Sequence, residues 1–258
     1  MISPELRSAV EKHALTEYPR ECCGVIVGGQ YRPCVNIAAN PLQDFQIDPQ
    51  DYADAEDAGE ITAIVHSHPG ARAQPSQSDL VSCEDAGIPL WVIVSLGGQR
   101  DGSIGIDDWY EFGPTGYEAP LVGCEFSHGT NDCYGLVRRY YKRTHGVVLP
   151  DFRRPDKWWE DGSSDLYTQN FSAAGFYALP AGTEPVPGDV LLMKIRSRNN
   201  VPNHAAVYIG DGWFIHHLWG ELSRRDQLMR YLPRVTHVLR YKEAHTWKHL
   251  EQSASTGA

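Results

Sequence analysis

A turn-rich break near residue 116 divides the chain and sets the main constraint on its fold. The segment GPTG at 113–116 separates two regions of apolar patterning, and glycine and proline are the residues that most strongly end helices and strands. The charge changes at the same place, because residues 1–116 hold 18 acidic and 6 basic residues whereas residues 117–258 hold 15 and 17. A chain of 258 residues is long enough for two domains of ordinary size. We therefore predict two domains, 1–116 and 117–258.

Composition limits the classes of protein to which the chain can belong. With 41% hydrophobic and 22% charged residues, it is an ordinary globular chain, which excludes a fully disordered, collagen-like or coiled-coil protein. The longest apolar stretch, residues 88–96, has about half the length that a bilayer requires, so we expect no membrane span. The N-terminal segment is acidic and lacks the apolar core of a signal peptide, so we expect folding in a cytoplasm. The acidic first half argues against nucleic acid as a partner.

The apolar pattern of the first half predicts an α/β fold in which helices flank a sheet. Helices are expected where a capping residue precedes proline, at Ser3-Pro4 and at Asp48-Pro49, and a third is expected over 78–86. Short apolar runs bounded by glycine or proline indicate strands. These runs lie at residues 24–28, 31–37, 61–65 and 89–96.

The second half is predicted to be α+β, with a helix first and antiparallel strands after it. Residues 131–145 have one apolar face and are followed by Gly146, which indicates a helix and its end. A Gly-Asp-Gly segment at 210–212 is typical of a hairpin. Further helices are expected at 164–174 and 222–231, and strands at 189–195, 204–209, 213–218 and 235–241. The tail at 244–258 is expected to be disordered.

Two histidines that follow the strand expected at 61–65 indicate a metal site. His66 and His68 are two residues apart, so both imidazoles lie on one face of an extended chain. Asp79, on the helix that follows, can add a carboxylate oxygen. Two nitrogens and one oxygen leave the fourth position of a tetrahedral zinc ion open for water, as catalytic zinc sites require. The metal brings the pKa of that water near neutrality, and Glu21 is the candidate for the general base that moves its proton.

This spacing resembles the motif of the JAMM (MPN+) metalloprotease family. The segment HSHP follows a remote glutamate, seven residues separate His68 from Ser76, and two separate Ser76 from Asp79. The resemblance implies one zinc ion bound by His66, His68 and Asp79. It also implies that Glu21 is the acid/base and that Ser76 donates to the tetrahedral oxyanion. Taken singly, each residue has an ordinary structural explanation, such as a turn, a helix cap or a surface acid.

A cysteine at a helix start and two later histidines indicate a second site, which depends on a thiol. Cys133 lies in the first turn of the helix expected at 131–145, where backbone N–H groups and the helix dipole favour a thiolate. His204, at the start of a predicted strand, is the candidate base. His216 lies twelve residues further on, across the hairpin, close enough to orient the base. His217 is the alternative third group, although strand alternation turns it to the opposite face.

The same residues resemble the NlpC-type cell-wall cysteine peptidases, which have a papain-like fold. The shared marks are DCYG, a Gly-Asp pair before a strand, and HAAVYIG followed by a second histidine. The resemblance implies Cys133 as nucleophile, His204 as base and His216 as orienter, with peptidoglycan stem peptides as substrate. The family's Tyr-x-Trp-Gly segment, whose tyrosine helps to bind substrate, is replaced here by FSHG. Tyr134 is then an alternative source of that hydroxyl.

A metal site followed by a thiol site narrows the field further, and the pair resembles the tail-tip assembly proteins of lambda-like bacteriophages. This resemblance covers nearly the whole chain. It implies a two-domain hydrolase that is made in the host cytoplasm, carried on the virion tail tip and active at the bacterial cell wall or periplasm. It implies zinc as cofactor, and other tail-tip proteins and peptidoglycan peptide stems as partners. Two alternatives stay open: a structural tail component with residual sites, and a cellular JAMM-type isopeptidase that removes a ubiquitin-like modifier.

Overall fold

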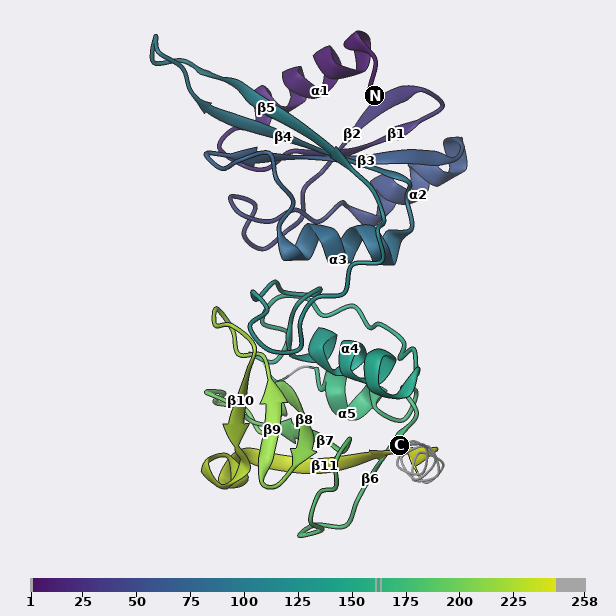
Figure 1. Ribbon diagram of the computed structural model, residues 1–258, viewed down its shortest axis with the longest axis vertical. Helices are drawn as coiled ribbons and strands as arrows, with labels where there is room; N and C mark the ends of the chain where they lie inside the picture. Colours follow the sequence, from purple (N-terminus) through teal and green to yellow (C-terminus); the bar gives the residue numbers. More distant parts are fainter. Residues whose placement is uncertain (1, 161, 163, 245–258) are drawn as a thin grey trace, which may run out of the picture. The chain divides into compact units, whose positions relative to one another are not determined.

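The computed structural model describes residues 2–160, 162 and 164–244 of the chain (Figure 1). The chain divides into two compact units, Met1–Tyr117 and Glu118–Ala258. The tail that the sequence predicts to be disordered lies, from residue 245 onward, outside the described residues. Among the described residues, no helix is both long enough and apolar enough to cross a membrane.

The first unit is built on a five-stranded sheet. Its strands are β1 (Cys23–Val27), β2 (Gln30–Cys34), β3 (Ile61–Pro69), β4 (Leu90–Gly98) and β5 (Ile104–Phe112). Their order across the sheet is β2-β1-β3-β4-β5, and only the pair of β3 and β4 is parallel. Both of these central strands are buried through most of their length, because both faces of the sheet are covered.

Three helices cover the two faces of this sheet. They are α1 (Pro4–Glu17), α2 (Pro49–Ala58) and α3 (Gln77–Ala86). In Figure 1, α1 lies on one face, and α2 and α3 lie on the other, where their Ala55 and Cys83 join the same buried apolar cluster. Each helix begins at a side-chain cap, provided by Ser3, Asp48 and Ser76. The predicted sheet flanked by helices is confirmed.

The second unit places a helix before an antiparallel six-stranded sheet. Its elements are α4 (Cys133–His145), α5 (Leu166–Asn170), β6 (Phe176–Ala178), β7 (Val190–Met193), β8 (His204–Gly210), β9 (Trp213–His216), β10 (Arg224–Gln227), η1 (Leu228–Arg230), η2 (Leu232–Arg234) and β11 (Val235–Tyr241). The strand order is β10-β9-β8-β7-β11-β6. In this unit α4 packs on β8, so that a helix start meets the beginning of a central strand (Figure 1). The predicted order, with a helix first and antiparallel strands after it, is confirmed.

Several elements differ from the prediction, among them the helix predicted at 164–174, which is confined to α5 (Leu166–Asn170). The helix predicted at 222–231 is wrong, because residues 224–227 form β10 and extend the sheet by pairing with β9, and η1 follows. The sequence also does not predict β5, an edge strand whose apolar pattern is interrupted by Asp107 and Asp108. It misses β6 as well, since three residues carry too little pattern.

Candidate active sites

The residues predicted to bind zinc lie together at the end of β3. His66 and His68 belong to this strand, and Asp79 to the first turn of α3. Nε2 of His66 lies 3.2 Å from Nε2 of His68. The carboxylate oxygens of Asp79 lie 3.3 Å from Nε2 of His66 and 3.5 Å from Nε2 of His68. Three possible ligand atoms therefore converge, and the described residues hold no other such group.

These distances fit a tetrahedral zinc ion. Ligand atoms at about 2.0–2.1 Å from the centre of a tetrahedron lie about 3.3 Å from one another, and the three observed separations are 3.2, 3.3 and 3.5 Å. Nδ1 of His68 donates to the carbonyl oxygen of Arg72 at 2.9 Å, so Nε2 of the neutral ring carries a lone pair. That lone pair faces Nε2 of His66 and lies close to the Asp79 carboxylate, so a cation held between these atoms would be bound by all three side chains. The residues present fit a metal ion.

Ser76 and Asp79 form a capping box at the start of α3. Oγ of Ser76 accepts from the backbone N–H of Asp79 at 3.1 Å, and Oδ2 of Asp79 accepts from the backbone N–H and the hydroxyl of Ser76, both at 2.8 Å. Burial opposes the charge of Asp79, yet the adjacent His66 and His68 hold the pKa of its carboxyl well below the usual range. The Ser76 hydroxyl is thus bonded to Asp79, and donation to an oxyanion requires it to turn.

Glu21 lies two residues before the start of β1, next to the histidine pair. The antiparallel pairing of β1 with β3 puts Cys23 opposite His66, and the same register two residues earlier brings Glu21 level with His68. The side chain is buried, and this burial raises the pKa of Glu21 to about 8, although His68 opposes the shift. A carboxyl group whose pKa lies near neutrality suits a group that must both accept and return a proton.

Cys133 is the first residue of α4, and Asp132 fixes it there as the helix cap. Oδ1 of Asp132 accepts from the backbone N–H of Gly135 at 2.8 Å, and Oδ2 accepts from Nε of Arg154 at 2.8 Å. Both side chains of this ion pair are buried. A Cβ atom at Gly135 would lie 2.0 Å from the carbonyl oxygen of Thr130, so only glycine fits. In the DCYG segment, Asp132 therefore caps the helix, Cys133 is the predicted nucleophile, and Gly135 allows the close approach of the Thr130 backbone.

The Cys133 thiol is less acidic in the structure than its place on the helix predicts. Burial and the charge of Asp132 raise the pKa of Cys133 to about 11, which outweighs the helix dipole. Burial also holds the pKa of His204 well below its ordinary value, and His216 adds to this shift. Near neutral pH both groups are uncharged.

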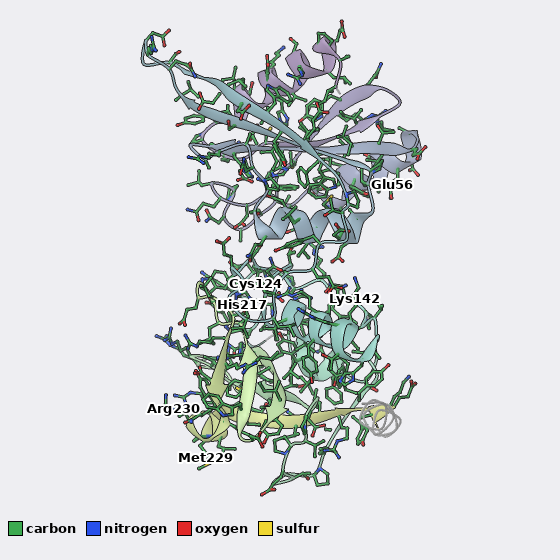
Figure 2. All side chains as sticks on the ribbon, viewed as in Figure 1. Glu56, Cys124, Lys142, His217, Met229 and Arg230 are labelled. Atoms are coloured by element: carbon green, nitrogen blue, oxygen red, sulfur yellow. The ribbon has the colours of Figure 1, made fainter. Side chains whose placement is uncertain are left out.

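The predicted base and its orienter are joined across the β8–β9 hairpin. Nε2 of His204 lies 3.0 Å from Nδ1 of His216, and both rings are buried. His217, labelled in Figure 2, has a different environment: its Nε2 lies 3.0 Å from the carbonyl oxygen of Glu221, and its ring packs edge-on against Phe126. Of the two adjacent histidines, His216 is therefore the one in contact with His204.

Cys133 and His204 line the same open groove of the second unit. The backbone of Ala205, the residue after His204, lowers the pKa of the Cys133 thiol and so lies close to it. Aromatic and basic side chains make up much of the remaining lining, among them Trp158, Trp159, Trp219, Arg196, Arg230 and Arg234. A groove of this composition suits an extended peptide that carries carboxylates.

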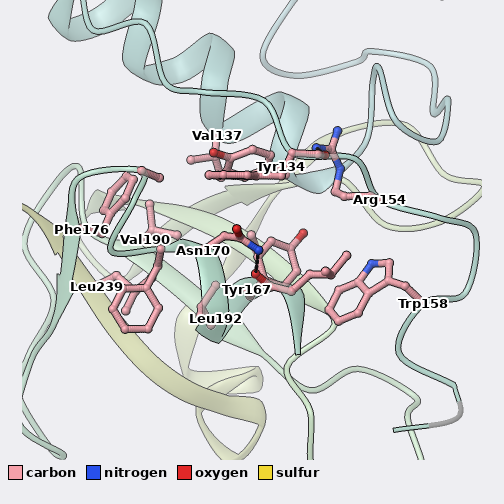
Figure 3. A pocket seen from close by; sticks show the side chains of 15 residues that line it. Tyr134, Val137, Arg154, Trp158, Tyr167, Asn170, Phe176, Val190, Leu192 and Leu239 are labelled. Atoms are coloured by element: carbon pink, nitrogen blue, oxygen red, sulfur yellow. Dashed lines mark hydrogen bonds between the residues drawn. The ribbon is translucent and has the colours of Figure 1, made fainter. Parts of the chain in front are cut away.

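A tyrosine that the sequence does not single out lies against Cys133. The hydroxyl of Tyr167, on α5, lies 3.0 Å from Sγ of Cys133. The predicted alternative, Tyr134, donates its hydroxyl to the carbonyl oxygen of Pro150 at 2.8 Å. Figure 3 shows Tyr134, Tyr167 and Trp158 around an apolar pocket of the second unit. Tyr167 is 34 residues from Cys133 on a different helix, so no local spacing reveals it.

The chain matches two protein families in succession. Residues 3–106 match the Prok-JAB family, the prokaryotic homologs of the JAB domain, and residues 110–241 match the NlpC/P60 family. The predicted fold classes are confirmed by these matches: a JAMM-like sheet flanked by helices, followed by a papain-like domain of the NlpC type.

Two phage proteins are similar to the chain over most of its length. Tail tip assembly protein K of Escherichia phage N15 is 38% identical over 241 residues, which cover 91% of this chain and 93% of that protein. Tail tip assembly protein K of Escherichia phage lambda is 38% identical over 207 residues, covering 80% and 91%. Among solved structures, NlpC1 from Trichomonas vaginalis is 23% identical over 46% of this chain and 40% of that one, with a TM-score of 0.34. The extent of the two phage matches shows that the chain belongs to the family of tail tip assembly protein K.

Proposed function

We propose that the second unit is a thiol peptidase that cleaves the peptide stems of peptidoglycan. The observation that carries this proposal is the hydrogen-bonded pair of His204 and His216 in a groove that also exposes Cys133. Covalent cleavage of a peptide bond needs a nucleophile, a base and a group that orients the base. The NlpC/P60 match supports the substrate class, with bonds beside γ-D-glutamyl and diaminopimelate residues as the sites of cleavage.

In the proposed reaction, His204 takes the proton of the Cys133 thiol while Sγ attacks the scissile carbonyl carbon. The imidazolium returns this proton to the leaving amine, and a thioester forms. A water molecule, deprotonated by the same imidazole, then hydrolyses the thioester and regenerates the thiol. Because the pKa of Cys133 is raised and that of His204 is lowered, the uncharged pair is the resting state. Tyr167 is placed to donate its hydroxyl hydrogen to the sulfur as negative charge develops.

We further propose that residues 1–116 form a zinc metallopeptidase domain that hydrolyses peptide or isopeptide bonds. The specific observation in favour is the convergence of His66, His68 and Asp79 at distances that fit a tetrahedral ion. Zinc bound there would polarise a carbonyl group and acidify a water molecule. Glu21 would accept a proton beside the metal and return it to the leaving amine, and Ser76 would donate to the oxyanion.

These activities would serve assembly of the tail tip and local opening of the cell wall. The names of the two phage relatives support other tail tip proteins as partners and a place in the virion. Synthesis in the host cytoplasm is part of the same proposal. Action at the bacterial wall or periplasm follows from the proposed substrate. The competing proposal, a structural tail component whose sites do not turn over, predicts no cleavage of any substrate. Membership of a phage tail family gives no support to a cellular isopeptidase.

Purified protein is expected to release soluble muropeptides from bacterial peptidoglycan. A zinc chelator is expected to change the rate by less than about twofold, because the thiol mechanism uses no metal. Chromatography with mass spectrometry of the digest measures both the rate and the bond cleaved. Absence of any product would contradict the peptidoglycan proposal and favour the structural component. If chelation abolishes cleavage of peptidoglycan, the cleavage belongs to the first unit, which holds the proposed metal site.

Replacing Tyr167 with phenylalanine is expected to lower kcat for muropeptide release about tenfold or more, since a donor to developing charge is removed. The hydroxyl of Tyr167 also lowers the pKa of the Cys133 thiol, which burial otherwise raises. In Tyr167→Phe the alkylation of Cys133 should therefore rise at higher pH than in the wild type. The matched control is Tyr134→Phe, which removes the bond to Pro150 and leaves the thiol contact intact. Equal alkylation profiles for Tyr167→Phe and wild type would contradict the role of this hydroxyl.

A further inference from the structure

The hydrogen-bonded histidines of the thiol site continue into a carboxylate that no sequence motif marks. Asp226 lies on β10, the edge strand that pairs with β9. Its Oδ2 atom lies 3.1 Å from Nε2 of His216. The same oxygen accepts from Nε of Arg224 at 3.1 Å and from the hydroxyl of Tyr231 at 2.8 Å. Two donors besides the histidine thus hold the carboxylate in place. A line of contacts runs from His204 through His216 to Asp226.

The chemistry of these contacts fixes which nitrogen of each ring carries hydrogen. An ionised carboxylate only accepts hydrogen bonds, so Nε2 of His216 carries the hydrogen. Nδ1 of the neutral His216 ring then has the lone pair, and Nε2 of His204 must donate to it across 3.0 Å. Nδ1 of His204 is left without a hydrogen. We propose that Asp226 is a positioning residue, which sets the tautomers of both histidines and leaves Nδ1 of His204 as the proton acceptor.

The charge of Asp226, like its position, favours proton uptake by the histidine pair. Burial opposes ionisation of Asp226, yet hydrogen bonds from Tyr231, Arg224 and His216 hold its pKa below the ordinary value. Burial lowers the pKa of His216, and Asp226 is the largest influence that opposes this shift. Of the other charged groups facing His216, Arg224 lowers its pKa and Glu221 raises it. Asp226 therefore stabilises the positive charge that the histidine pair takes up when the thiol loses its proton.

A purely structural role for Asp226 is the alternative, because Arg224 and Tyr231 also tie it to the end of β10 and the segment that follows. The two roles differ in what Asp226→Asn changes. The amide has the same shape, and its oxygen can still accept from the three donors, so the anchor is retained. Only the negative charge is lost. An anchor should tolerate this change, whereas a carboxylate whose charge stabilises the protonated histidine pair should not.

The inference rests on the proposed thiol peptidase, and kinetics give its first test. For Asp226→Asn we expect kcat for muropeptide release to fall about 10- to 100-fold, with KM changed less than about threefold. The acid limb of the pH profile should move to lower pH, because the imidazolium loses its carboxylate. Asp226→Glu, which keeps the charge, should recover part of the loss. Arg225→Gln, on the exposed side of the same strand, is the matched control and should retain the wild-type profile.

Nitrogen-15 NMR of the histidine rings gives a second test, which needs no substrate. In the wild type we expect a hydrogen on Nε2 of both His204 and His216, and Asp226→Ala should mix the tautomers. A hydrogen on Nδ1 of wild-type His204 would overturn the inference even if the protein cleaves peptidoglycan. A wild-type kcat and pH profile in Asp226→Asn would also overturn the inference. The same holds if Asp226→Ala lowers Tm but leaves the signals of the histidine rings unchanged. If the wild type cleaves no peptidoglycan, the proposed function fails, while the ring signals still decide the role of Asp226.

Discussion

Replacing Cys133 with alanine is expected to abolish muropeptide release, with a fall in kcat/KM of about 10⁴-fold or more. The thiol is the only group in the proposed mechanism that forms a bond to the substrate, so neither His204 nor a bound water can take its place. Alanine at the first position of α4 keeps the Asp132 cap, because the cap bonds to the backbone of Gly135. The free energy of unfolding should therefore change little. Digestion of peptidoglycan, followed by mass spectrometry, measures the loss.

The matched control is Cys124→Ala, which removes another thiol of the same unit. Cys124 is fully buried and lies outside the groove that holds the nucleophile, so its loss should lower stability and leave cleavage intact. Alkylation offers an independent measurement, since Cys133 is the one free cysteine among the described residues that is not buried. Muropeptide release that persists in Cys133→Ala and stops on chelation would show that the first unit cleaves the wall.

The convergence of His66, His68 and Asp79 is the part of the molecule that the sequence predicts best. The reason is that these residues are local to two elements. An alternating strand puts His66 and His68 on one face, and a capped helix start brings Asp79 to the end of that strand. At this site, the spacing of the three residues in the sequence is enough to predict that their side chains lie together. Glu21 is predicted from its resemblance to a family motif, and its place beside His68 arises from the pairing of β1 with β3.

The thiol site is predicted less completely, because several of its contacts join distant segments. Arg154 and Tyr167 approach Cys133 or its cap from loops and a helix that share no period or spacing with α4. Asp226 is missed for a different reason. The segment that holds it is predicted as a helix, whereas pairing with β9 makes it a strand and turns the carboxylate to His216. Tertiary pairing overrides local propensity at this edge of the sheet.

The acidity of Cys133 also could not be predicted from local sequence, because it depends on parts of the folded chain outside the helix. A helix start alone predicts a stabilised thiolate, because the dipole and the free N–H groups are properties of the local element. The raised pKa depends on burial and on the neighbouring Asp132, which become known only when the chain is folded. Burial destabilises the Cys133 thiolate by more than the helix dipole stabilises it. In the proposed mechanism, the reaction then begins with proton transfer to the imidazole pair.

Purified protein is expected to contain about one zinc ion per chain, and His66→Ala and Asp79→Asn are each expected to bring this close to zero, because two ligands rarely hold zinc. In Asp79→Asn the amide oxygen can still accept from the Ser76 backbone, so the start of α3 should persist. Zinc bound only to the folded state adds about 2.7 kcal/mol when its concentration is about a hundred times its Kd. A chelator should therefore lower Tm of the wild type and leave both variants unchanged. Elemental analysis and thermal unfolding measure the two effects.

Glu21→Gln is the control that separates a ligand from a base. Glu21 lies beside the three ligand atoms without belonging to their group, so its variant should keep the zinc ion and the response of Tm to chelation. Peptide or isopeptide hydrolysis by the first unit should nevertheless be lost, since no other group in the proposed mechanism moves the proton. If Glu21→Gln loses zinc as His66→Ala does, Glu21 is a ligand and the assignment of roles in this unit is wrong. Wild-type protein that takes up no zinc when the ion is added would contradict the metal site itself.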